Sequence, residues 1–146
     1  MSAGGQGRSA RLSLPANATS PSRARKFVVR TLTDWGVASV DDAALVVSEL
    51  VTNALLHART SMVVSLAEDG TDALRLSVAD GSVAALQERH FSLESGTGRG
   101  LRLLDSIALE WGVDRRDDGK TVWCRLPVDG ASAAYAGFDI DAVEAL

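Results

Sequence analysis

The sequence has few of the features that mark secreted or membrane-spanning chains. Its single cysteine, Cys124, excludes an internal disulfide and is typical of a reducing compartment. Its longest uninterrupted apolar run is Ala43–Val47, far below the about 20 residues that a transmembrane helix needs. No apolar stretch follows the basic residues near the start, so we expect neither a secretory signal nor a membrane partner. These absences favour a cytoplasmic protein.

Acidic side chains are missing from residues 1–30, and basic ones are missing from residues 129–146. Residues 1–30 are therefore a basic segment, which could contact nucleic acid. However, no aromatic residues alternate with its charges, and the whole chain carries a net charge of −4. The segment is better interpreted as a solvated helix face that follows a mobile start. We therefore expect no direct nucleic-acid partner.

The length and composition are those of one globular domain. Apolar residues make up 46% of the 146 positions and charged residues 23%, which is ordinary usage. Residues 1–11 are rich in Gly, Ser, Ala and Arg, and we expect them to be disordered. Residues 12–127 form the predicted domain. Residues 128–146 form an acidic tail with a weak helical pattern near its end.

Periodicity predicts an α+β fold. A short strand at residues 12–14 precedes a helix that begins at Ser20-Pro21 and ends at Gly36. The remaining expected elements are a helix over 39–58, a hairpin of 62–67 and 73–79, a loop over 81–95, a helix after residue 100, and a hairpin of 111–114 and 120–126. This order predicts two layers, with helices on one face of a sheet.

The second helix carries a polar stripe on an otherwise apolar surface. Glu49, Asn53 and His57 are spaced by four residues and therefore lie above one another on the helix. An ionised Glu in apolar surroundings is costly unless it is paired or coordinated. Asn53 could offer a neutral oxygen to a hard cation, and Glu49 could orient or deprotonate a nucleophile. The alternative is a partly exposed stripe that holds neighbouring backbone groups.

A glycine cluster precedes the third expected helix. It consists of Gly96, Thr97, Gly98, Arg99 and Gly100. Glycines allow backbone amides to approach a ligand, and a helix N-terminus adds positive potential, so phosphate is the natural ligand. A Rossmann motif would need a preceding strand, which residues 88–95 do not predict. A Walker A motif fails because position 114 is Asp and no helix follows Gly119-Lys120-Thr121. A flexible loop that ends in a helix remains the alternative.

Asp80 ends a predicted strand where the long loop begins. A carboxylate at this point could accept a hydrogen bond from an amino group such as that of adenine. Taken alone, Asp80-Gly81 equally fits an ordinary turn at the end of a strand.

Together, these motifs resemble one superfamily. Ser48–Ala54 on a helix, Asp80-Gly81 after a strand and Gly96–Leu101 before a helix are similar to the Bergerat-fold ATPases of gyrase, heat-shock chaperones and histidine kinases. The short length and the ending at Trp111–Val113 and Gly119–Trp123 resemble the anti-sigma factor serine/threonine kinase branch. The resemblance covers residues 12–127. It implies a two-layer α/β sandwich whose mixed, mostly antiparallel sheet has helices on one face.

The resemblance also implies roles for individual residues. Asn53 would hold Mg²⁺ against the phosphates of ATP, and Glu49 would be the general base. Asp80 would accept from the adenine amino group, with Thr121 assisting through water. The glycine cluster (Gly96, Thr97, Gly98, Arg99 and Gly100) would wrap the triphosphate, and residues 82–95 would be the lid.

The sequence departs from the family pattern at the lid. Ser82 and Ala84 stand where the family has glycines two and four residues after its Asp, which restricts the lid hinge. Arg99 replaces the more usual leucine of the glycine loop, which is a milder change.

The leading hypothesis is an ATP-binding anti-sigma-type regulator that phosphorylates a serine of an anti-sigma factor antagonist and grips a sigma factor. Members of that branch often dimerise, so a homodimer is an open expectation. Three alternatives remain: a non-catalytic binding module, a detached histidine kinase catalytic domain and a scaffold with a dead site. The chain has no room for a dimerising helix pair with a phospho-accepting His, which disfavours the second.

Overall fold

The computed structural model describes residues 7–82 and 99–129. In chain order, the elements of these residues are β1 (Ser9–Leu14), α1 (Ser20–Trp35), α2 (Val40–His57), β2 (Met62–Asp69), β3 (Ala73–Asp80), α4 (Arg99–Ile107), β4 (Glu110–Arg116) and β5 (Gly119–Pro127). The expected helical pattern at the end of the tail and most of the long loop lie outside these residues.

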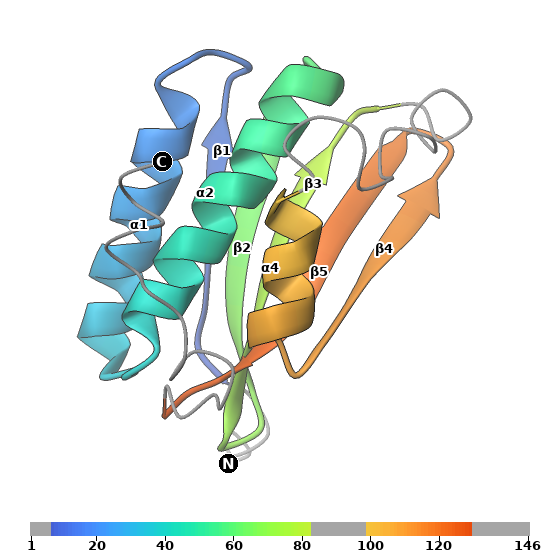
Figure 1. The fold of residues 1–146 in the computed structure, drawn as a ribbon. Coiled ribbons are helices and arrows are strands. Elements are labelled where there is room, and N and C mark those ends of the chain that lie inside the picture. Colours follow the sequence, from blue (N-terminus) through green and yellow to red (C-terminus); the bar gives the residue numbers. More distant parts are fainter. Residues whose placement is uncertain (1–6, 83–98, 130–146) are drawn as a thin grey trace.

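The five strands of this part of the chain form one sheet in the order β1-β2-β3-β5-β4. Every neighbouring pair is antiparallel. Helices α1, α2 and α4 all cover the same face of the sheet (Figure 1). The predicted α+β class and the helices on one face are therefore confirmed. A mixed sheet was expected, but the described strands contain only antiparallel pairs.

The core lies between the helices and alternate positions of the strands. Since successive strand side chains point to opposite faces, every second residue reaches this layer. Its strand side chains, each no more than 6% exposed, are Leu14, Met62, Val64, Leu66, Leu74, Leu76, Val78, Val122, Cys124 and Leu126. The helices complete it with Ala24, Val28, Leu32, Val47, Val51 and Leu104, among others.

Helix α1 begins and ends where the sequence predicts. Pro21 occupies its first turn, and Gly36 follows its last residue in the left-handed conformation, with φ of 74°. The amide of Val37 donates to the carbonyl of Leu32, which satisfies one of the carbonyls left unpaired at the helix end. Helix α2 likewise starts just after Ser39.

The first strand is longer than predicted. It begins at Ser9, because residues 9–14 pair one for one with residues 62–67 of β2. Arg8 adds an ion pair to Glu68 at 2.7 Å and lies over the Trp35 ring, 5.3 Å from its centroid. The expected disorder of residues 1–11 therefore does not extend to residues 8–11.

Cys124 is fully buried on β5, as its sequence neighbours predict. Burial raises the pKa of its thiol to about 12, so the thiolate needed of a nucleophile does not form at neutral pH. In the described part of the chain, no helix combines the length and hydropathy that a membrane span requires.

Asp42 is an unusual buried residue of α2. It lies in the first turn of α2, is 1% exposed, and neither carboxylate oxygen has a hydrogen-bond partner among the described residues. Burial, with a smaller contribution from Asp41, raises its pKa to about 6. The folded protein thus holds a proton on Asp42 more tightly than the unfolded chain does.

We expect Asp42→Asn to reduce the pH dependence of stability. Because the pKa of Asp42 rises from 3.8 to about 6 on folding, its contribution is most favourable below the lower value and is lost as pH rises through the upper one. Urea unfolding of both proteins across this range measures the effect. The variant should be more stable than the parent above about pH 6 and not below pH 3.8. A difference in the free energy of unfolding that stays constant with pH would contradict the raised pKa of Asp42.

Candidate functional site

Four segments that are distant in the sequence meet at one end of the molecule. The C-terminal ends of α2 and β3, the start of α4 and the turn between β4 and β5 all lie there (Figure 1). Antiparallel pairing explains part of this arrangement, since β5 begins where β3 ends. Helix α2 packs against α4 and β3, which brings its C-terminal half to the same end.

The polar stripe of α2 lies on a helix that is otherwise largely core. Glu49 is 9% exposed, while Asn53 and His57 are partly exposed one and two turns later. The helix buries Val46, Val47, Leu50, Val51 and Ala54. A carboxylate at this degree of burial is retained at lowest cost where other polar groups or a ligand compensate it. The stripe therefore runs from a buried carboxylate to a more accessible amide.

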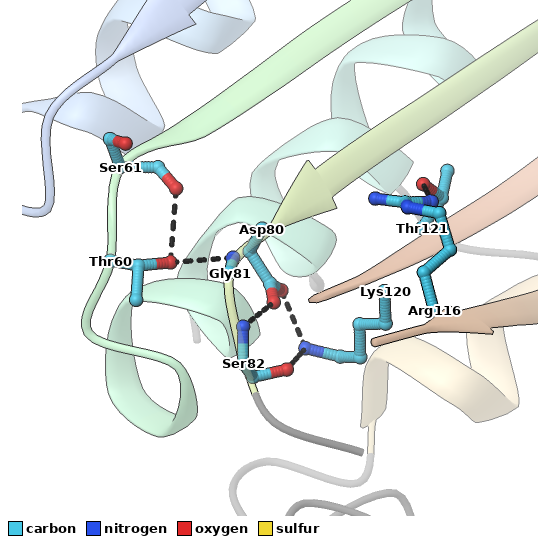
Figure 2. A network of polar contacts seen from close by, with 8 residues as sticks. All are labelled: Thr60, Ser61, Asp80, Gly81, Ser82, Arg116, Lys120 and Thr121. Carbon is cyan, nitrogen blue, oxygen red and sulfur yellow. Dashed lines mark hydrogen bonds and ion pairs between the residues drawn. The ribbon is translucent and has the colours of Figure 1, made fainter. Parts of the chain in front are cut away.

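Asp80 begins a tight turn at the end of β3. Its Oδ1 accepts a hydrogen bond from the Ser82 amide at 2.9 Å, which fixes the chain two residues ahead. The Gly81 amide donates to Thr60 Oγ1 at 2.8 Å, and that hydroxyl donates to the carbonyl of Ser61 at 3.0 Å (Figure 2). These bonds tie the end of β3 to the segment that follows α2.

Lys120 is the partner of Asp80 on the neighbouring strand. Its Nζ lies 2.5 Å from Asp80 Oδ2 and donates to Ser82 Oγ at 2.9 Å (Figure 2). The side chains of Lys120 and Asp80 are only 3% and 2% exposed. Burial lowers the pKa of Lys120, while Asp80 acts in the opposite direction. The strand end thus carries an enclosed ion pair.

The sequence contained a signal for Lys120 that the motif comparison missed. Lys120 is in phase with Val122 and Cys124 on β5, so it faces the helices. Gly119 permits the close contact between the strands, because a Cβ there would overlap the carbonyl oxygen of Asp80. A lysine in phase with a buried strand needs a carboxylate, and Asp80 lies directly opposite.

Thr121 is paired with Ala79, while Asp80 is paired with Lys120. Thr121 lies one position out of phase with the core side of β5, and its hydroxyl accepts a hydrogen bond from Arg116 Nη1 at 2.7 Å (Figure 2). Successive strand residues point to opposite faces, so Thr121 belongs to the face away from the helices. The residue directly opposite Asp80 is therefore Lys120, and the assistance of Thr121 through water stays a prediction.

The glycine cluster is only partly within the described residues. Arg99 and Gly100 are the first two residues of α4, which confirms a helix directly after the cluster. Gly96, Thr97 and Gly98 lie outside the described part, as do residues 83–95 of the expected lid, including Ala84. Ser82 is 3% exposed, and its amide and hydroxyl both bond to the ion pair. It therefore anchors the start of the expected lid.

Within residues 7–82 and 99–129, no three His, Cys, Asp or Glu side chains gather closely enough to hold a metal ion. Asn53, the magnesium ligand that the sequence predicts, lies on α2.

A comparison with protein families decides the family. The model of the histidine kinase-like ATPase domain matches residues 14–126, from the last residue of β1 to the penultimate residue of β5. The chain belongs to this family. A search of curated proteins found no match. Membership in the histidine kinase-like ATPase domain family supports ATP binding, and the two-layer arrangement is that of its Bergerat-type fold.

In this histidine kinase-like ATPase domain, we expect Asp80→Asn to be strongly destabilising. Removing one partner of a buried ion pair leaves the other charge uncompensated, at a cost of about 3–5 kcal/mol. Asp69→Asn is the matched control, because Asp69 pairs with Arg125 at 2.8 Å but is 44% exposed. Its loss should stay below about 1 kcal/mol. Urea unfolding measures both, and equal losses would contradict the structural role of the pair.

Proposed function

We propose that this chain is an ATP-binding anti-sigma-type regulator with protein serine/threonine kinase activity. The observation that carries the proposal is Glu49, buried one helical turn before the more accessible Asn53 on α2. Family membership supports the nucleotide, and the buried carboxylate supports the transfer chemistry. The substrate would be a serine of an anti-sigma factor antagonist, and a sigma factor would be the second partner. A homodimer belongs to the same proposal.

The residues of the site fit Mg²⁺ and ATP. Asn53 offers a neutral amide oxygen at an accessible position, which suits a hard cation that keeps its other ligands from phosphate and water. The amides at the start of α4 offer positive potential to phosphate oxygens, and the glycine cluster that ends at Gly100 precedes them. Asp80 supplies the carboxylate for the amino group of adenine. ATP would supply the phosphoryl group.

Glu49 is proposed as the general base. Its carboxylate would take the proton of the serine hydroxyl while that oxygen forms its bond to the γ-phosphorus and the bond to the leaving oxygen of ADP breaks. Glu49 is buried on α2, a rigid element, and a general base has to be held in a fixed position relative to the hydroxyl.

A second candidate is a non-catalytic binding module in which nucleotide shapes a partner surface. Ser82 favours it, because this residue stands at a glycine position of the family pattern and is bonded to both members of the ion pair. A lid anchored in this way would close less freely over a triphosphate. Replacing Glu49 separates the two candidates.

Asn53→Ala should abolish Mg²⁺-dependent ATP binding, because the amide oxygen is the proposed magnesium ligand. Calorimetric titration with ATP, with and without Mg²⁺, measures this. Asn17→Ala is the matched control, since Asn17 lies in an exposed turn before α1 and its side-chain oxygen accepts hydrogen bonds from the amide and hydroxyl of Thr19. Unchanged binding by the Asn53 variant would refute the magnesium role.

Glu49→Gln should keep ATP binding and lower transfer by about two to four orders of magnitude, the usual contribution of a general base. The measurement is transfer of labelled γ-phosphate to a panel of purified anti-sigma factor antagonists. If the parent protein binds ATP but labels none of them, the kinase half of the proposal falls and the binding module stands. If the variant transfers as fast as the parent, Glu49 is not the base.

A further inference from the structure

The Asp80–Lys120 pair has a consequence for which nucleotide base the site accepts. The two residues lie directly opposite each other on β3 and β5. Lys120 Nζ is 2.5 Å from Asp80 Oδ2, and both side chains are almost fully buried. Ser82 accepts a second hydrogen bond from the same ammonium group at 2.9 Å. The carboxylate proposed to read adenine is therefore already engaged by a cation of the chain itself.

We propose that Lys120 is a specificity-determining residue of the nucleotide site, which reduces the preference for a 6-amino purine over a 6-oxo purine. The inference rests on the proposed function, in which Asp80 accepts a hydrogen bond from the amino group of adenine. Lys120 is not needed for that function, so the two can fail separately.

The first step is competition for Asp80 Oδ2. Both adenine N6 and Lys120 Nζ are donors, but the ammonium group is charged, so the carboxylate attracts it as an ion pair in addition to accepting its hydrogen bond. Displacing the ammonium would also leave a charge buried without its partner. An amino group therefore gains less from Asp80 here than it would gain from a lone carboxylate.

The second step concerns a base with an oxo group at the same position. A carbonyl oxygen is an acceptor, so it is attracted to the ammonium group of Lys120 where an amino group is repelled. It can bind without breaking the ion pair. The same lysine thus weakens the binding of the 6-amino purine and strengthens the binding of the 6-oxo purine.

The third step is the fixed position of the ammonium group. Ser82 Oγ holds it from a second direction, and the Ser82 amide holds the other oxygen of Asp80 at 2.9 Å. A long lysine side chain normally has many rotamers, but two acceptors and 3% exposure leave this one little freedom. The charge is therefore held beside Asp80 and is not a mobile surface group.

The experiment compares Mg·ATP with Mg·ITP, whose base carries a 6-oxo group, by calorimetric titration of the full chain. The parent protein should bind both with similar affinity. Lys120→Met should favour ATP by at least about tenfold, since a site that binds an amino group rejects an analogue lacking it. Arg116→Met is the control, because it removes a cation from the same hairpin on the face away from Asp80. The ratio of ATP to ITP affinity of this control should equal that of the parent protein.

Circular dichroism shows whether Lys120→Met folds, and Lys120→Gln replaces it if not, since the amide keeps a donor to Asp80 without the charge. Two results overturn the inference and leave the proposed function intact. One is a parent protein that already prefers ATP over ITP tenfold or more. The other is a folded Lys120 variant whose ratio of ATP to ITP affinity equals that of the parent. Failure of the parent and both lysine variants to bind either nucleotide overturns the proposed function as well.

Discussion

The antiparallel register of β3 with β5 is the constraint on which both the core and the site depend. It pairs Leu74 with Leu126, Leu76 with Cys124 and Val78 with Val122, all on the helix side of the sheet. The next pair in the same phase is Asp80 with Lys120, so the ion pair ends a ladder of apolar pairs. A slip of one residue would turn the core side chains of one strand to the opposite face and place Thr121 opposite Asp80. Apolar packing thus fixes which polar residues meet at the strand end.

Helix α2 carries a second compromise between packing and chemistry. It contacts α1, α4 and the sheet, and most of its surface is buried. Glu49 is held within this surface, while Asn53 and His57 lie nearer its edge. The apolar neighbours make the helix rigid, and they also desolvate the Glu49 carboxylate, which is unfavourable. The same trade recurs at Asp42, whose buried carboxyl has a raised pKa and no described hydrogen-bond partner. The core and the proposed chemistry therefore depend on the same helix.

Local patterns predicted most of the fold, because they depend on near neighbours. Ser20-Pro21 and Gly36 marked the ends of α1, and alternation marked β3. The start of β1 at Ser9 was missed, since pairing with β2, rather than local composition, orders that segment. For the site, Glu49, Asn53 and Asp80 could be named from motifs. The same motifs leave out Lys120, because its pairing with Asp80 depends on a strand register that joins residues 40 positions apart. Motif similarity predicts a site role for Thr121, and the strand phase places this residue on the face away from the helices.

The central claim is that an adenine nucleotide binds at the end of the molecule where β3, α2 and α4 meet. Amide hydrogen exchange, with and without Mg·ATP, tests it most directly because it reports position as well as binding. Exchange should slow in peptides that contain Asp80–Ser82, the C-terminal half of α2 and the first turn of α4. It should stay unchanged in β1 and in the first half of α1. Slowing confined to those distant segments, or no slowing at saturating ATP, would contradict a nucleotide site at this end.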